Sequence, residues 1–116
     1  MKKFIALKEH TSTTSRANYL KIETYYSLGG YNVFTYKPET RGYYLSVSPV
    51  ERGERNGITM ESYTAFSGVK ICVLEVTRKS KKAEETAEKL AAEKENALIQ
   101  YILNKYNLEV LPNEQL

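Results

Sequence analysis

Residues 43–57 read YYLSVSPVERGERNG: a strand-like run, a proline, and then two Glu-Arg pairs among glycines. Side chains in the first half alternate between an apolar set and a more polar set, which is typical of a strand with one buried face. The apolar set consists of Tyr43, Leu45 and Val47. Pro49 has no N–H for a sheet ladder, so it indicates either an edge position or the end of pairing. The charged segment that follows, residues 51–57, has the composition of a turn.

The same two-residue period recurs on both sides of this stretch and predicts four further strands. They are YLKIETYYSL (residues 19–28), YNVFTYK (31–37), ITMESYTAF (58–66) and VKICVLEV (69–76). Gly29 and Gly30 predict a tight two-residue turn that returns the chain as the second of these strands. VKICVLEV is the most apolar of them, so we expect it at the centre of the sheet, with Cys72 as a small buried hydrophobe.

The hydrophobic period changes from two to 3.6 residues near Arg78. One stripe then runs to about Asn107, and it contains Ala83, Ala87, Leu90, Ala91, Lys94, Ala97, Leu98, Tyr101, Ile102 and Lys105. This pattern predicts one long amphipathic helix. Its second half, with Leu98, Tyr101 and Ile102, is expected to pack on the sheet. Its alanine-rich first half is expected to project or to meet a partner.

These elements predict an α+β fold in a single domain, residues 1–116. We expect an antiparallel sheet of about four or five strands with one long C-terminal helix packed on one face. The predicted boundaries are a polar N-terminal segment at 1–18, the sheet at 19–77, the helix at 78–107 and a tail at 108–116. In the tail, Val110 and Leu111 are expected to be pinned to the domain. A chain of 116 residues can bury a core without a disulfide or a metal.

The composition is that of a soluble globular protein, with 41% apolar and 27% charged residues and a net charge of only +3. Ten tyrosines stand against three phenylalanines and no tryptophan, which favours a sheet with a tyrosine-rich face. The N-terminal run FIAL is too short for a signal peptide, and no stretch approaches the roughly 20 apolar residues of a membrane helix. We therefore expect no membrane association and a cytoplasmic location.

Convergent catalytic groups are missing from the sequence. His10 is the one histidine, in a polar segment without a neighbouring cysteine or carboxylate cluster, and the chain has no aspartate. Gly29-Gly30 lacks the spacing and the following helix of a phosphate-binding loop, and no serine lies in a nucleophile-elbow pattern. These absences predict a protein that is not an enzyme and that uses neither a metal nor another cofactor.

Two charged segments are candidates for a binding role. Arg52 and Arg55, in ERGERNG, can each bind a phosphate or a carboxylate through a forked guanidinium, although a solvated hairpin end is the favoured interpretation. At the predicted helix start, four cations oppose the helix dipole, which prefers anions there. They are Arg78, Lys79, Lys81 and Lys82. Glutamates one turn later compensate for them, so a solvated helix start is favoured over a site for phosphate or an acidic partner.

A third candidate is the tyrosine-bearing face of the sheet. Its members, with the lysines beside them, are Tyr25, Tyr36, Tyr44, Lys21 and Lys37. Aromatic rings next to cations on an open sheet can stack the unpaired bases of a single-stranded nucleic acid. The competing interpretation is that the tyrosines pair across strands and stiffen the sheet. The sequence has no recognisable RNA-binding signature, which favours this second interpretation.

Two stretches carry a resemblance to a group of known proteins: YYSLGGYNVFTYKPETRGYYLSVSPVERG (residues 25–53) and MESYTAFSGVKICVLEVTRKSKKAE (residues 60–84). The chain resembles short accessory proteins, without an assigned function, that are carried on conjugative and integrative mobile elements of Firmicute bacteria. The resemblance implies a setting in mobile DNA or in a phage of such a bacterium. It implies no activity and no site residues.

Two functions from different classes are therefore expected. The first is a small non-enzymatic module that binds nucleic acid through the tyrosine and lysine face and the basic helix start. The alternative is a protein-interaction module, either a homodimer through the alanine-rich helix or an inhibitor of a host defence protein in the manner of an anti-CRISPR. A steep salt dependence distinguishes phosphate binding from contact with an apolar protein surface.

Overall fold

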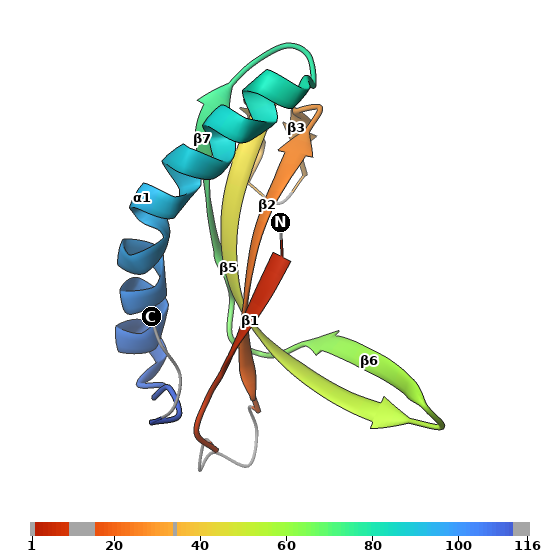
Figure 1. Ribbon diagram of the computed structural model, residues 1–116, viewed down its shortest axis with the longest axis vertical. Helices are drawn as coiled ribbons and strands as arrows, with labels where there is room; N and C mark the ends of the chain where they lie inside the picture. Colours follow the sequence, from red (N-terminus) through yellow and green to blue (C-terminus); the bar gives the residue numbers. More distant parts are fainter. Residues whose placement is uncertain (1, 10–15, 34, 113–116) are drawn as a thin grey trace.

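The computed structural model describes residues 2–9, 16–33 and 35–112, and it confirms the α+β class (Figure 1). One antiparallel sheet contains five strands: β1 (Lys2–Ala6), β2 (Tyr19–Ser27), β5 (Gly42–Arg55), β6 (Ile58–Tyr63) and β7 (Val69–Glu75). A separate two-stranded sheet consists of β3 (Gly30–Asn32) and β4 (Lys37–Glu39). The helix α1 (Lys81–Tyr106) packs along one face of the larger sheet.

β5 is the central strand of the larger sheet. Along one edge it pairs with β2 over residues 42–50; along the other it pairs first with β7, over 42–47, and then with β6, over 50–55. The expectation that VKICVLEV would be central is therefore wrong. In the described part of the chain β7 pairs only with β5, and only one of its faces packs on the core. Cys72 lies on the other face and is exposed rather than buried.

Pro49 lies where β5 changes its partner on that second edge. The Pro49 carbonyl accepts a hydrogen bond from the Thr64 hydroxyl (3.4 Å), so the proline backbone faces the gap between β7 and β6. The next carbonyl, that of Val50, faces the opposite edge and accepts from the Asn18 N–H (3.1 Å). The N–H and carbonyl of one strand residue point to the same side, so the missing N–H removes no bond to β2. On this edge the pairing with β7 ends at Val47 and the pairing with β6 begins at Val50, whereas the pairing with β2 continues through Pro49.

The hairpin predicted at Gly29-Gly30 is wrong. β2 pairs with β5 instead, and the chain between them forms a short excursion in which β3 and β4 pair only with each other. Both glycines have positive φ angles, 75° and 110°. A Cβ at position 29 would lie 2.7 Å from the Glu39 carbonyl oxygen. Gly29 therefore permits the two ends of the excursion to approach each other closely.

Two further strand boundaries differ from the prediction. β5 continues to Arg55, so the turn predicted at 51–57 shortens to Asn56 and Gly57, whose positive φ angles (55° and 77°) are typical of a two-residue hairpin turn. The N-terminal segment contains β1, which pairs antiparallel with the outer edge of β2. Among its five residues only Ile5 is buried, so the segment is too short to show an alternating pattern that would predict a strand.

The helix begins and ends close to the predicted residues. The Ser80 hydroxyl accepts a hydrogen bond from the Ala83 N–H (3.0 Å), and Asn107 ends the helix in a left-handed conformation (φ 54°). The buried helical residues are Ala87, Ala91, Ile99, Ile102 and Leu103. Two expectations are wrong: Tyr101 is 52% exposed, and the alanine-rich first half packs on the sheet.

Side-chain size explains the first difference, and the position of the buried helical face explains the second. Ala87 is fully buried because its methyl group lets the helix lie close to the sheet near Tyr43, which is also buried. The Tyr43 hydroxyl donates to the Ser80 carbonyl (3.4 Å) and so contacts the start of the helix. In the second half, the buried face is shifted by one residue toward Ile99 and Leu103, and this shift leaves Tyr101 in solvent.

The hydrophobic core lies between the sheet and the helix. It includes Ile5, Leu7, Leu20, Ile22, Leu45, Val47, Ile99, Ile102, Leu103 and Leu108. Leu7 and Val110 form an antiparallel bridge, and the Leu111 N–H donates to the Ala6 carbonyl (3.1 Å), so the tail is pinned as predicted. The described residues contain no helix with the length and apolar character needed to cross a membrane.

We expect Ala87→Leu to lower the free energy of unfolding by about 1–3 kcal/mol, because the larger side chain has no space between the helix and the sheet. Ala97→Leu makes the same change on an exposed side of the same helix and is expected to stay within about 0.5 kcal/mol of the parent. Urea unfolding followed by circular dichroism measures both variants. Equal stabilities would mean that the first half of the helix is not docked.

Candidate binding face

The face of the sheet opposite α1, here called the open face, carries polar and tyrosine side chains. Alternation along β2, β5 and β7 directs every second residue toward the core and the residues between them away from the helix. The open face comprises Lys21, Glu23, Tyr25, Tyr44, Ser46, Ser48, Lys70 and Cys72. The structure thus brings three of the predicted site residues, Lys21, Tyr25 and Tyr44, onto one surface.

Two hairpins project at opposite ends of the open face. One, here called the ribbon, is residues 50–63, formed by the second half of β5 and by β6; it extends away from the side that carries the helix (Figure 1). The other, here called the arm, is the excursion of residues 28–41 that contains β3 and β4. Both expose large apolar side chains: Ile58, Met60 and Tyr63 on the ribbon, and Leu28, Tyr31, Val33 and Tyr36 on the arm.

A hollow of about 550 Å³ lies on the open face beside the ribbon. Its lining residues are Lys21, Glu23, Tyr25, Ser46, Ser48, Tyr63, Gly68, Val69 and Lys70. The lining therefore combines two ammonium groups, one carboxylate, several hydroxyl groups and two aromatic rings. A volume of this size is within the range of sites that accept a small molecule or a few side chains of another protein.

Lys21 lies at the ribbon side of the hollow and is only 6% exposed. Its ammonium group donates to Glu61 Oε1 (2.7 Å) and to the Tyr63 hydroxyl (3.4 Å), and Glu23 Oε2 lies 3.8 Å away. Burial lowers the pKa of Lys21, but these partners outweigh it and hold the pKa above its ordinary value. The hydrogen bond from Lys21 in turn lowers the pKa of Glu61. The ion pair joins the ribbon to β2, and the carboxylate of Glu61 balances the positive charge of Lys21.

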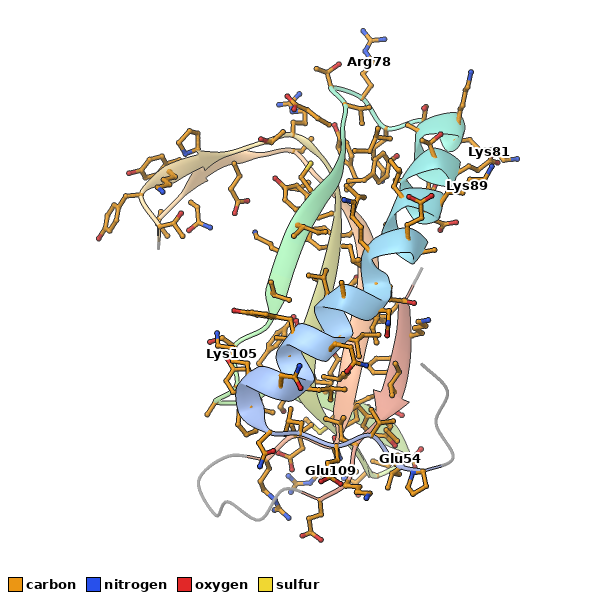
Figure 2. The ribbon with its side chains drawn as sticks, turned by 90° about the vertical axis from the view of Figure 1, so that its left-hand side faces the viewer. Glu54, Arg78, Lys81, Lys89, Lys105 and Glu109 are labelled. Atoms are coloured by element: carbon orange, nitrogen blue, oxygen red, sulfur yellow. The ribbon has the colours of Figure 1, made fainter. Side chains whose placement is uncertain are left out.

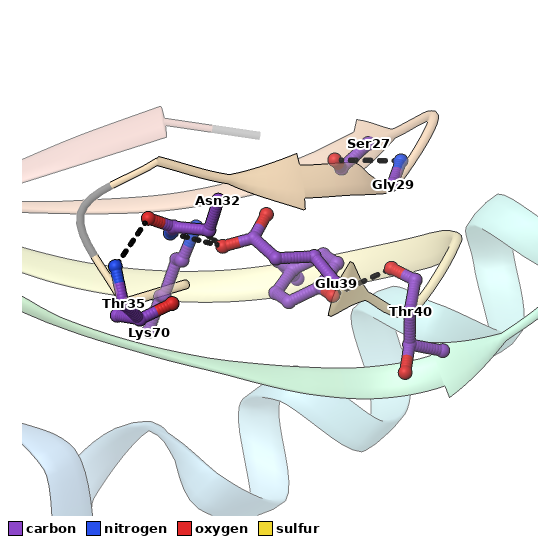
Figure 3. A network of polar contacts seen from close by, with 8 residues as sticks. Ser27, Gly29, Asn32, Thr35, Glu39, Thr40 and Lys70 are labelled. Carbon is purple, nitrogen blue, oxygen red and sulfur yellow. Dashed lines mark hydrogen bonds and ion pairs between the residues drawn. The ribbon is translucent and has the colours of Figure 1, made fainter. Parts of the chain in front are cut away.

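Lys70 lies on β7 and is held by the arm (Figure 3). Its ammonium group donates to Glu39 Oε1 (2.7 Å), which also accepts from Asn32 Nδ2 (2.8 Å). The Thr35 N–H donates to Asn32 Oδ1 (3.1 Å), so the network continues toward the end of the arm. The hydrogen bonds from Lys70 and Asn32 lower the pKa of Glu39. Both lysines of the hollow are therefore in ion pairs with carboxylates.

The tyrosines of the open face contact each other. The rings of Tyr25 and Tyr44 stack at 5.8 Å with an interplanar angle of 18°. Tyr44 is buried, and its hydroxyl donates to the Thr40 carbonyl at the base of the arm (2.6 Å). Tyr36 does not join them: it lies on the arm, 77% exposed, with a positive φ angle of 57°. The arrangement agrees with the expected cross-strand pairing of tyrosines that stiffens the sheet.

The other candidate cations are scattered. The Arg52 guanidinium lies 3.8 Å from the centre of the Phe4 ring and is half-buried, so it stacks within the domain instead of pointing from a hairpin tip. Arg55 is exposed at the end of the ribbon, and Lys37 is exposed on the arm. Neither lines the hollow.

The basic cluster lies at the start of α1. Arg78, Lys79, Lys81 and Lys82 are all exposed in the turn after β7 and the first helical residues. Figure 2 shows Arg78, Lys81 and Lys89 at this end of the molecule, opposite the end with Lys105. The Lys79 ammonium lies 5.9 Å from the Tyr26 ring centre and shares a small hollow with Glu84 and Glu88. The cluster is therefore apart from the hollow of the open face.

Sequence reasoning missed the carboxylates that complete the site. Glu39 and Glu61 contact Lys70 and Lys21 from segments 31 and 40 residues away, and no local pattern indicates such pairings. Tyr63, which lines the hollow, has the parity opposite to the apolar Ile58 and Met60, and this alternation could have indicated that it lies on the other face of β6. Among the described residues no group of three or more His, Cys, Asp or Glu side chains could hold a metal ion, and His10 lies outside those residues.

No protein-family model, no curated protein and no solved structure matches this chain.

We expect Glu61→Ala to lower the free energy of unfolding at pH 7 by about 2 kcal/mol, because it leaves the buried ammonium of Lys21 with the Tyr63 hydroxyl and the more distant carboxylate of Glu23. The pKa of Glu61 is lowered in the folded state, so its contribution is present above the ordinary value of 4.5 and is lost as the pH falls through the folded value. The difference between parent and variant should therefore shrink below about pH 4.5. Urea unfolding at several pH values measures it.

Ser62→Ala is the matched control for Glu61→Ala, because Ser62 lies on the other face of the same strand and is exposed. It is expected to change stability by less than about 0.5 kcal/mol at every pH. Two variants with the same pH-independent effect would contradict a stabilising Lys21–Glu61 pair.

Proposed function

We propose that the protein is a small non-enzymatic module that binds another protein on the open face, between the arm and the ribbon. One observation carries the proposal: the hairpins at both ends of a hollow expose large apolar side chains. Exposed apolar groups rimmed by polar residues are typical of protein interaction sites. Tyrosine, which is present here as Tyr63 and Tyr31, is enriched at such sites.

The electrostatics of the hollow also support a protein partner. When a protein binds nucleic acid, its Lys and Arg side chains neutralise phosphates, and the nucleic acid releases counterions. A cation that is already paired with a carboxylate is less available for this role. Lys21 and Lys70 are each within 2.7 Å of a glutamate oxygen. Tyr44 is buried beneath the base of the arm and offers no free ring face to a base. A partner with mixed charges and some apolar surface matches this lining better than a polyanion.

In the setting that the sequence resemblance implies, the partner would be a protein of the bacterial host or of the mobile element. Inhibition of a host defence protein is one such role. It requires only a stable contact surface and no catalytic groups, so it agrees with the chemistry of the open face.

Nucleic-acid binding is the second candidate, because Arg78, Lys79, Lys81 and Lys82 are all exposed at one end of the domain. This proposal places the contact at the helix start and not on the tyrosine face. Four cations facing phosphates give an affinity that falls steeply with salt.

A photo-reactive phenylalanine analogue at position 63 tests the protein-binding proposal. We expect it to crosslink to one discrete protein in an extract of the native host, at both low and high salt. The same replacement at Tyr101 is the control, since Tyr101 is also exposed but lies on the helix. Tyr31→Ser, which truncates an exposed side chain of the arm, should weaken the crosslinking from position 63. Equal crosslinking from both positions, or none from position 63, would refute binding on the open face.

Fluorescence anisotropy with single-stranded DNA, double-stranded DNA and RNA at two salt concentrations tests the second candidate. If the basic cluster binds phosphate, the triple variant of Lys79, Lys81 and Lys82 to Ala should lose an affinity that is salt-sensitive in the parent. Lys37→Ala, which removes an exposed cation from the arm, should leave it unchanged. Absence of binding by the parent at low salt would exclude this candidate.

A further inference from the structure

The outer edges of the sheet differ in how they are protected against pairing with another chain. β1 carries Lys2 and Lys3, and Lys3 forms an ion pair with Glu95 on the helix (2.9 Å). β7 contains an irregular register opposite Tyr43 and Tyr44. Lysines and bulges of this kind are the usual means by which edge strands avoid intermolecular pairing.

β6 has none of these protections within the described part of the chain. Its sequence, ITMESY, contains no lysine, arginine or proline, and its register with β5 is regular over all six pairs. Every residue of β6 is exposed, and Ile58 and Met60 are 66% and 54% exposed. Threonine, isoleucine and tyrosine also favour strands. β6 is therefore an open, regular edge with strong strand-forming residues.

The direction of the free backbone groups follows from the hairpin turn. Asn56 and Gly57 form a two-residue turn, so Arg55 and Ile58 exchange hydrogen bonds with each other. Alternation then directs the N–H and carbonyl of Thr59 and Glu61 away from β5.

The hydrogen bonds of Asn18, on the other edge of β5, confirm this alternation of backbone directions. Its side chain accepts from the Arg52 N–H (2.9 Å) and donates to the Arg52 carbonyl (3.0 Å). The backbone of Arg52 therefore points away from β6, and Arg52 is the pairing partner of Glu61.

We propose that β6 pairs antiparallel with β6 of a second copy of this chain, with the two-fold axis passing Met60. In this register Thr59 lies opposite the partner's Glu61, and their outward N–H and carbonyl groups exchange hydrogen bonds at both symmetry-related positions. Met60 lies opposite its own copy as a non-hydrogen-bonded pair, the geometry in which side chains are closest. The contact uses the ribbon edge and goes beyond the protein-binding proposal for the open face.

Charge and side-chain size both agree with this register. The single charged residue of β6, Glu61, faces a threonine of the second copy, and its charge is balanced by Lys21 at 2.7 Å in its own chain. On the other face of the ribbon, Ile58 and Met60 of the two chains form one continuous apolar strip. Gly53 is the β5 neighbour of Met60, and nothing lies within 4 Å of the position where its Cβ would be. The methionines therefore have room to lie against each other.

Disulfide trapping tests the register directly. In a Cys72→Ser background, Met60→Cys should form a disulfide-linked dimer rapidly under mild oxidation, because facing Cα atoms in such a pair lie about 4.5 Å apart, within the disulfide range. Ser62→Cys is the matched control on the same face of β6, and the proposed register places its two copies several residues apart. Equal rates for the two variants would refute the register.

Thr59→Pro tests whether backbone pairing holds the dimer. Proline removes only the outward N–H and leaves the hydrogen bonds to β5 intact, so the monomer should fold with a normal circular dichroism spectrum. The dimer dissociation constant from sedimentation equilibrium should rise about tenfold or more, whereas Thr59→Val, which keeps the N–H, should resemble the parent. A parent that is monomeric at the highest soluble concentration, or a Thr59→Pro variant that dimerises as tightly as Thr59→Val, would overturn the proposal. Crosslinking from position 63 to a different protein reports on the open face independently.

Discussion

Strand β5 hydrogen-bonds to three other strands, and the positions of the remaining elements follow from that constraint. Its first half is enclosed by β2 and β7, so its apolar residues can face the helix and form the centre of the core. Its second half has lost β7 and pairs with β6 on that edge. Only a long, uninterrupted strand can pair with β7 in its first half and with β6 in its second. Pro49 is compatible with such a strand because its missing N–H would face the gap between β7 and β6, where no strand needs it.

The two faces of the sheet are stabilised by different physics. On the helix side, burial of Leu20, Val47 and Ile102 provides the hydrophobic driving force. On the open face, paired charges and stacked tyrosines fix the projecting hairpins: Lys21 holds the ribbon, and Lys70 with Tyr44 holds the arm. Polar contacts are directional, so they can fix the angle of a hairpin that has no core of its own.

Periodicity predicted the position of most elements correctly, but it predicted poorly which strands pair with each other. The change from period two to 3.6 located the helix within a few residues, and parity placed Lys21, Tyr25 and Tyr44 on one face. The choice of partner strands is set by tertiary contacts, which periodicity does not record, so VKICVLEV became an edge strand and Gly29-Gly30 opened an arm. Glu39 and Glu61 were not predictable for the same reason, because their lysines are distant in sequence. Only Tyr63 had a local signal.

The bridge between Leu7 and Val110 has a consequence for the order of folding. The first strand of the sheet reaches its full set of neighbours only when residues near the other end of the described chain are present, and the buried Ile5 shares a core with Ile99 and Ile102. Contacts of such long sequence separation carry a large loop-closure cost and are typical of slow folding. While the chain is being synthesised, the N-terminal strand therefore remains without its final contacts until the helix has followed it.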